Sequence, residues 1–429
     1  MTSTPDISNS PANPSSSHSK TERLGFFDKI GLPSTLKWGF LGLLVFMIGD
    51  GVELGYLAPY LEGKGLGQGQ VALLFTVYGI TVAISSWLSG PMSQVYGPRK
   101  VMWAGLAIWG VLEVAFLTLG ISTLNYPLML VTYALRGFGY PLFAYGFLVW
   151  IAAATPAKRL GMAASWFWFA YAAGLPTLGS LTASIAIPAI GTMGTLWLSL
   201  VLVVVGGALS LMAMAKTKGG EPLTKTAESP FAAMGRSISI MWREPISTVG
   251  GLVRTVNTSS QYAFFIVLPG FFMTTIGFSL EEWLRLLTIM FLGNLVGNLA
   301  SGYIGKKIGL RNTIALMGAI GTSLGILAVF YVPQMAPGNF AIASLVAIFY
   351  GIMLGGYVPL SALMPMVLPH DKAGALAVVS LGAGAATWVG PIVVAAMRPL
   401  FGLEGVMWAF VVLYLLSGAM IMLVREPKV

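Results

Sequence analysis

Between residues 38 and 424 the sequence is a succession of apolar runs, each long enough to cross a bilayer as a helix. Strands of a membrane barrel would be about ten residues long and would alternate with polar residues. These runs are instead continuous and rich in Leu, Gly and Ala, which is typical of transmembrane helices. Charged residues make up 9% of the chain, whereas a soluble domain carries roughly 25%. The sequence therefore predicts an all-α integral membrane protein.

We expect twelve transmembrane helices arranged as two six-helix bundles. The first six are predicted at residues 38–60, 69–93, 101–121, 126–152, 161–187 and 191–215. The second six are predicted at residues 246–275, 280–304, 312–333, 338–365, 373–399 and 404–424. The predicted domains are a disordered cytoplasmic tail (1–34), an N-terminal bundle (35–215), a cytoplasmic linker (216–244), a C-terminal bundle (245–424) and a short cytoplasmic tail (425–429).

The distribution of Lys and Arg predicts the orientation of these helices. One side of the predicted topology holds the N-terminal tail, the linker and most other basic residues, namely Arg99, Lys100, Lys158, Arg159, Lys306, Lys307, Arg311, Lys372, Arg425 and Lys428. The other side holds only Lys64, Arg285 and Arg398. Because cationic loops are translocated poorly, the basic side is predicted to be cytoplasmic, with both termini inside. The net charge of +9 then reflects membrane topology rather than a nucleic-acid partner, and we expect the inner (cytoplasmic) membrane.

An internal repeat supports the division into two bundles. The connection between the second and third predicted helices runs from Gly90 through Gly97 to Arg99, and that between the eighth and ninth runs from Gly302 through Gly309 to Arg311. In both copies the glycines are seven residues apart and the arginine follows two residues later. Glycine permits a tight turn or close helix approach, and Arg can hold the cytoplasmic helix ends, so these loops are candidate gating elements.

These paired loops resemble the signature of the major facilitator superfamily, over residues 37 to 424. The acidic residue usual in that signature is Gln94 in the first copy and Lys306 in the second, which puts its loop salt bridge in doubt. Five further strings resemble the polyol permease family: GDGVELGYL, RGFGYPLFAY, GTMGTLWLSL, LVRTVNT and GFSLEEWL, in this order along the chain. The resemblance implies the major facilitator fold, with two pseudo-symmetric bundles, and import of a sugar alcohol such as ribitol or arabinitol.

Five ionisable residues fall inside predicted spans: Asp50, Glu53, Glu113, Arg136 and Arg254. Each costs about 2.5–3.5 kcal/mol at the centre of a bilayer, so each is a functional candidate. Asp50 lies roughly 18 Å along the first helix, near mid-membrane. Glu53 is three residues further on, so both acids are expected to face one cavity.

Three acids and two bases leave one negative charge uncompensated, and a carboxylate in that situation takes up a proton. We therefore expect Glu53 or Asp50 to carry an exchangeable proton, with Arg136 restraining the other acid. The alternative is that these residues have only a structural role and hold helices together. For Glu113, a structural or lipid-interface role is as plausible as a functional one.

A second set of polar residues predicts the substrate site. Arg254, Asn257 and Gln261 share one stripe of the seventh helix, which should face Asp50 and Glu53 across the pathway. Interhelical hydrogen bonding is the alternative role for this stripe. Aromatic residues within spans can stack on a sugar alcohol and bond its hydroxyls; the candidates are Tyr140, Trp168, Tyr171, Tyr357 and Trp388.

The predicted function is secondary active import of a ribitol- or arabinitol-like polyol with a proton, by alternating access, in a monomer. Alternatives are an organic-anion symporter holding a carboxylate with Arg136 and Arg254, a drug exporter, or a receptor that does not transport. No cysteine is present, and the two histidines, His18 and His370, cannot form a metal cluster. With no nucleophile–base constellation either, an enzyme is disfavoured. No cofactor is expected beyond an ion gradient.

Overall fold

The computed structural model describes residues 32–223, 240–370 and 372–426. Most of the predicted N-terminal tail, much of the linker and the last three residues lie outside this range. The first half contains α2 (Lys37–Gly51), α3 (Leu57–Gly63), α4 (Gln68–Tyr96), α5 (Pro98–Ala115), α6 (Tyr126–Arg136), α7 (Gly139–Ala154), α8 (Ala157–Ala172) and α9 (Gly179–Ala213). The second half contains α11 (Pro245–Thr274), α12 (Leu280–Ile308), α13 (Leu310–Thr313), α14 (Thr322–Met335), α15 (Phe340–Leu354), α16 (Leu360–Val367) and α17 (Lys372–Ile421).

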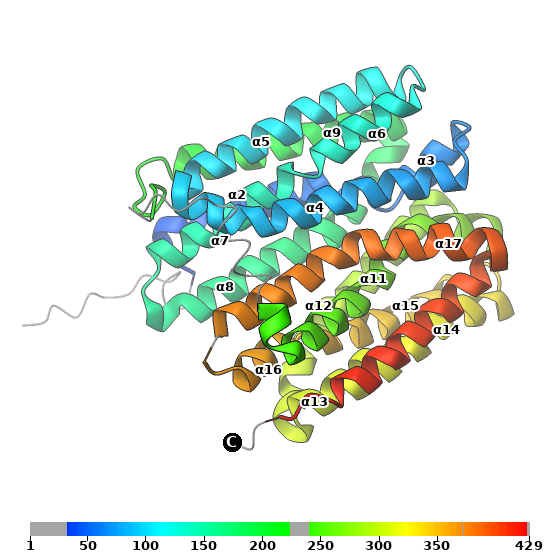
Figure 1. Cartoon of the computed structure of the whole chain (residues 1–429). Coiled ribbons are helices and arrows are strands. Elements are labelled where there is room, and N and C mark those ends of the chain that lie inside the picture. Colours follow the sequence, from blue (N-terminus) through cyan, green and yellow to red (C-terminus); the bar gives the residue numbers. More distant parts are fainter. Residues whose placement is uncertain (1–31, 224–239, 371, 427–429) are drawn as a thin grey trace, which may run out of the picture.

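The predicted all-α membrane fold with twelve crossings is confirmed. Eight helical stretches of the described chain are long and apolar enough to span a bilayer. Two of these are double-length, and each is interrupted by a glycine with positive φ, Gly191 in α9 and Gly402 in α17. Figure 1 shows α17 doubling back as an orange and a red rod. The interrupted first helix (α2 and α3) and α11 complete the twelve.

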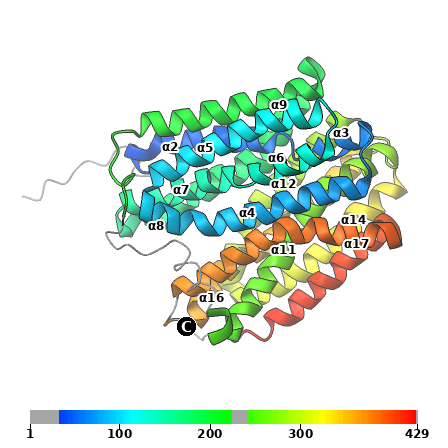
Figure 2. The same ribbon diagram turned by 45° about the horizontal axis from the view of Figure 1, so that its top comes forward.

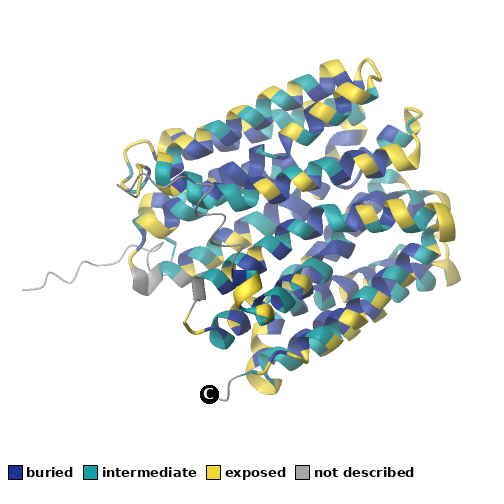
Figure 3. Cartoon of the chain, in the orientation of Figure 1, coloured by how far each residue is buried: buried dark blue, intermediate teal, exposed yellow. Residues whose placement is uncertain are grey.

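The outward faces of the helices are apolar, as lipid requires. Large hydrophobic side chains stand exposed along these faces, for example Val111 on α5, Leu299 on α12 and Leu345 on α15. Figure 3 shows exposed positions alternating with buried ones along the same helices, so each helix has one face inward and one outward. In water this much exposed apolar surface would be unfavourable, whereas in a bilayer it costs nothing.

The two halves pack together at one end of the molecule. Figure 1 shows α2 beginning and the chain ending at the left, which we call the terminal face, while α3 and the turn of α17 lie at the opposite face. At the opposite face one apolar core runs across both halves, from Tyr56 and Phe75 to Phe265 and Trp283. Towards the terminal face each half has its own separate core. The structure is therefore closed at the opposite face.

The most extensive direct contacts between the halves involve α4 with α17 and α12 with α9, and α3 also contacts α11. Helix α4 lies beside the first part of α17 in both views (Figures 1 and 2). Here the Thr387 hydroxyl donates a 2.7 Å hydrogen bond to the Gly79 carbonyl. Helix α12 packs on α9 and the π-helical turn Ala173–Leu178. An ion pair at 4.0 Å between Arg398 and Glu62 lies at the opposite face.

The first transmembrane helix is broken between α2 and α3, beside Asp50 and Glu53. Gly49 and Gly55 flank the break, and their carbonyl groups are satisfied from elsewhere: Ser199 donates to Gly49 at 2.7 Å, and the indole of Trp283 donates to Gly55 at 2.7 Å. Unwound backbone is tolerated at membrane depth only when its polar groups find such partners. The break thus frees residues 52–56 from helical geometry without leaving those two carbonyls unpaired.

Gly51 marks the closest approach of this break to its neighbours. A Cβ atom at Gly51 would overlap the main-chain carbonyl of Leu175. We expect Gly51→Ala to lower the free energy of unfolding by about 1–3 kcal/mol, because backbone cannot move aside as a side-chain tip can. Thermal unfolding in detergent measures this. Gly63→Ala is the matched control, since no heavy atom of the described residues lies within 4 Å of a Cβ there. Equal unfolding temperatures for both variants would contradict the prediction.

Candidate functional site

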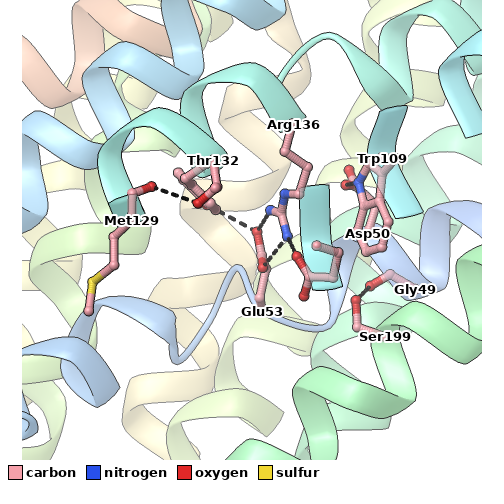
Figure 4. A network of polar contacts seen from close by, with 10 residues as sticks. Gly49, Asp50, Glu53, Trp109, Met129, Thr132, Arg136 and Ser199 are labelled. Atoms are coloured by element: carbon pink, nitrogen blue, oxygen red, sulfur yellow. Dashed lines mark hydrogen bonds and ion pairs between the residues drawn. The ribbon is translucent and has the colours of Figure 1, made fainter. Parts of the chain in front are cut away.

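The buried charge network of the first half centres on Arg136, the last residue of α6. Its side chain is fully buried and pairs with two carboxylates, Glu53 at the helix break and Glu113 in α5. One guanidinium nitrogen, Nη1, donates to Glu53 Oε2 at 2.9 Å and also contacts Glu113. The hydroxyl of Tyr133 donates a further 3.0 Å bond to Glu53. Figure 4 shows Arg136 extending from its helix towards Glu53.

Aromatic rings enclose the same guanidinium. Its central carbon lies 4.6 Å from the ring centroid of Tyr133, 4.9 Å from that of Trp109 and 5.5 Å from that of Tyr78. Such faces attract a cation while excluding water. The network is therefore dry and rigid, a setting in which each charge depends strongly on its partners.

Asp50 lies beside this network but outside its ion pairs. It is 3% exposed, and the indole N–H of Trp109 donates a 2.6 Å hydrogen bond to its Oδ1. Among the residues that the structure describes, no cation lies within ion-pair distance of Asp50. Figure 4 shows Asp50 and Trp109 together on one side of Arg136. Three carboxylates thus share a single guanidinium, and Asp50 is the one without a direct cationic contact.

The structure shows the surroundings of Glu113 and Arg254, which the sequence left open. Glu113 is fully buried against Arg136 rather than turned towards lipid. Arg254 belongs to the second half and forms no ion pair with this network. The excess of negative charge around Arg136 is consequently larger than the sequence count of all five residues suggests.

The polar stripe of α11 separates into two environments. Asn257 is buried within the second half, where it accepts a 2.9 Å bond from the Ser417 hydroxyl, and its carbonyl accepts a 2.6 Å bond from Tyr414. Arg254 is half-buried and lies over the ring of Tyr357, 3.8 Å from the centroid. Gln261, one turn beyond Asn257, is half-buried. The oxygens of Asn257 therefore accept hydrogen bonds within the second half, while its Nδ2 has no partner among the described residues. Arg254 instead lies against Tyr357.

Tyrosines from both halves lie within electrostatic range of Arg254. Tyr145 of α7 and Tyr262 of α11 both interact electrostatically with the Arg254 guanidinium, and Tyr262 also interacts with Asp50. Tyr171 of α8 stacks on Tyr145 with centroids 6.3 Å apart, and the rings of Tyr140 and Tyr171 are 6.4 Å apart. These phenols link the charge network of the first half to Arg254 in the second.

The two tryptophan candidates occupy different settings. Trp168 is 47% exposed, yet its ring is 6.1 Å from that of Tyr145 and 5.6 Å from that of Tyr171. It therefore sits at the edge of the tyrosine group. Trp388 is half-buried in α17, where α17 passes Gly79 of α4. Its position is at the contact between the halves.

The repeated loops form matching turns at the terminal face. Gly97 and Gly309 both have φ of +91°, a conformation that only glycine adopts freely, and each separates two helices. By contrast, Gly90 and Gly302 lie inside helices, and no heavy atom of the described residues lies within 4 Å of a Cβ at either. Close helix approach, one of the two roles considered for these glycines, therefore does not apply at Gly90 and Gly302.

Acidic residues from later segments reach both loops. In the first half Glu221 pairs with Arg99 at 3.4 Å. In the second half, Glu426 accepts hydrogen bonds of 2.9 and 3.1 Å from the backbone N–H groups of Leu310 and Arg311. The signature acids replaced by Gln94 and Lys306 thus have counterparts in the segments that follow the last helix of each half. We call these two contacts the loop braces.

Comparison with known proteins fits this architecture. The profile of the Major Facilitator Superfamily matches residues 39–284 and 250–429, which together cover nearly the whole described chain. The chain belongs to this superfamily. The D-xylose-proton symporter structure superposes with a TM-score of 0.68 at 18% identity, covering 92% of this chain and 97% of that one, and shares the fold.

Two proteins similar to this chain in sequence are named as transporters of different substrates. The α-ketoglutarate permease of Bacillus subtilis (strain 168) is 41% identical over 91% of this chain and 89% of its own length. The ribitol transporter of Klebsiella pneumoniae is 36% identical over 93% of each chain. The predicted resemblance to polyol permeases is thereby confirmed. The chain is a membrane transporter and not an enzyme.

Several contributors to the site were not predicted, although helical spacing could have indicated two of them. Trp109 lies four residues before Glu113, and Tyr133 lies three residues before Arg136, so each shares a helix face with a known candidate. Tyr145 and Tyr262 carry no such signal, because their proximity to Arg254 arises only when helices from both halves meet.

Proposed function

We propose that this transporter imports a small polyhydroxylated solute of the ribitol and arabinitol class together with a proton. The observation that carries the proposal is the buried cluster of three carboxylates around one guanidinium, with tyrosines of both halves within electrostatic range of Asp50 or Arg254. A polyol has no charge to balance, so a site for it needs hydroxyl-bonding groups rather than counter-ions. Tyr140, Tyr145 and Tyr171 supply such groups beside aromatic faces.

Proton coupling is proposed to act through Asp50. Arg136 neutralises one unit of charge and is already engaged by Glu53 and Glu113. A buried carboxylate without a cationic contact favours its protonated form. Trp109 donates one hydrogen bond to Asp50 Oδ1, and within the described residues the second carboxylate oxygen remains available to hold a proton. Binding and release of that proton would change the charge beside Tyr262 and hence beside the substrate space.

Movement is proposed to follow alternating access, with residues 35–215 and 245–424 rocking as two bundles around a midplane site. The separate cores at the terminal face and the joined core at the opposite face correspond to one end point of that motion. If the Lys- and Arg-rich terminal face is cytoplasmic, this conformation faces inward in the inner membrane. The relative named as a ribitol transporter supports this class of cargo.

Counterflow in proteoliposomes tests the proposal. Vesicles loaded with unlabelled ribitol or arabinitol should accumulate labelled ribitol transiently, whereas vesicles loaded with a hexose should not. An imposed inward proton gradient should drive net uptake, and a pH-sensitive dye should record proton entry with it. If no pentitol or hexitol in a panel supports counterflow, the polyol assignment is refuted. Uptake that is indifferent to pH would refute coupling alone.

A further inference from the structure

Arg254, in α11, has no ion-pair partner among the residues that the structure describes. Its Nη1 atom is buried and has no hydrogen-bond partner, and no carboxylate in the described part of the chain lies within ion-pair distance. The ring of Tyr357 offsets part of its charge by a cation–π contact, with 3.8 Å to the centroid. A charge retained at membrane depth without a protein counter-ion is costly, which favours a role in binding.

Asn257, three residues further along α11, is a polar neighbour of Arg254 on the same helix. Its side-chain oxygen accepts a hydrogen bond from Ser417, whereas its Nδ2, like Arg254 Nη1, has no partner among the described residues. Its environment is that of a residue whose role is to join helices. Arg254, although longer and charged, has found a ring but no oxygen acceptor for Nη1. Arg254 therefore differs from Asn257 in carrying a full charge at the unpartnered donor, and an acceptor for Nη1 would have to come from outside the described residues.

The groups around Arg254 define the chemistry of that acceptor. A guanidinium presents several N–H donors in a planar fork that matches a carboxylate. Tyr145 and Tyr262 lie within electrostatic range, and phenol hydroxyls can donate to a carboxylate or bond to alcohol groups. Arg136 cannot share this task, because Glu53 and Glu113 already occupy it. The guanidinium of Arg254 is therefore available to pair with a single substrate carboxylate.

We propose that Arg254, with the hydroxyls of Tyr145 and Tyr262, forms a carboxylate-binding subsite, so that this transporter also carries small polyhydroxylated monocarboxylates. The carboxylate lies at Arg254 in the second half, and the hydroxylated chain extends towards Tyr140 and Tyr171 in the first. A second carboxylate at the far end would approach the acid-rich network, which is unfavourable. The inference rests on the proposed function, because it extends the same central site from a sugar alcohol to the corresponding sugar acid.

Ribitol and ribonate provide the matched test, since they differ only where a terminal CH2OH becomes a carboxylate. Purified full-length protein in proteoliposomes is assayed for ribitol counterflow, and each compound is titrated as a competitor. We expect ribonate to compete at a concentration at least about tenfold lower than ribitol, a difference of about 1.4 kcal/mol, because hydrogen bonds between charged groups are stronger than those between neutral ones.

Arg254→Gln should weaken both competitors but reduce the preference for ribonate over ribitol at least about tenfold. Arg254→Lys, which keeps the charge without the planar fork, should restore part of that preference. The control is Arg285→Gln, which removes an exposed arginine from α12 and should leave the preference unchanged. The remaining ribitol counterflow shows that each variant is folded.

The outcomes separate the two proposals. If ribitol is exchanged but ribonate competes no better, or if Arg254→Gln weakens both equally, the carboxylate subsite is refuted and the polyol proposal stands. If ribonate alone is exchanged, in an Arg254-dependent manner, the subsite is supported and the polyol assignment fails. If neither compound is exchanged by the unmodified protein, both proposals are refuted.

Discussion

Replacing Arg136 by methionine is expected to give a protein that is inactive and strongly destabilised. The change leaves Glu53 and Glu113 facing each other in a dry interior, with the four surrounding rings unable to compensate. Removing one partner of a buried ion pair costs about 3–5 kcal/mol. Thermal unfolding in detergent should show the loss, and counterflow should be absent.

A triple variant distinguishes lost charge balance from lost packing. Combining Arg136→Met with Glu53→Gln and Glu113→Gln removes every member of the ion-pair set, so no partner of a broken ion pair is left charged. Asp50, which Trp109 holds, is unchanged. The triple variant should regain most of the unfolding temperature lost in Arg136→Met, because replacing a whole buried ionic network by neutral side chains often leaves stability unchanged. Transport should stay absent. An Arg136→Met protein as stable and active as the unmodified chain would show that the network contributes neither to folding nor to function.

Replacing Asp50 by asparagine is expected to uncouple transport from the proton gradient. Asparagine keeps an oxygen that can accept the Trp109 hydrogen bond, but it cannot exchange a proton. With one proton per substrate, a gradient of one pH unit sustains about tenfold accumulation in the unmodified protein, since one unit is worth 1.36 kcal/mol. The variant should lose this accumulation and still perform counterflow.

Two further variants complete the uncoupling experiment. Glu404→Gln removes an exposed carboxylate that accepts a hydrogen bond from the Tyr331 hydroxyl, and this variant should accumulate substrate normally. Glu53→Gln alters the acid that Arg136 and Tyr133 hold through three contacts. Normal accumulation by Asp50→Asn would exclude Asp50 as the carrier, and loss of accumulation by Glu53→Gln alone would then assign the proton to Glu53.

The fold could be predicted from sequence because every segment that crosses lipid must be a long, predominantly apolar helix. Long apolar runs, their spacing and the repeated glycine loops were sufficient for twelve helices, including the turns at Gly191 and Gly402. The break after Gly51 was not predicted, because apolar composition is the same in an unwound turn as in a helix. It becomes visible only when Ser199 and Trp283 are seen to satisfy the carbonyls beside it.

The sequence predicted which residues belong to the site better than it predicted which of them contact one another. Intramembrane charge singled out Asp50, Glu53, Glu113, Arg136 and Arg254, since each is expensive in lipid. Which acid meets which base depends on helix rotation and distance between segments up to 83 residues apart, as for Arg136 and Glu53. The separation of Arg254 from Arg136 depends on the same tertiary information, and it changes the charge balance that the sequence implied.

The loop braces bear on how motion between the halves could be observed. Glu221 joins its segment to Arg99, and Glu426 joins its segment to the start of α13, so each contact lies wholly within one half. Tilting one bundle against the other would leave both contacts intact. A spin label near Glu221 and another near Glu426 would each travel rigidly with its own bundle. The distance between the two labels would then report the opening angle of the molecule directly.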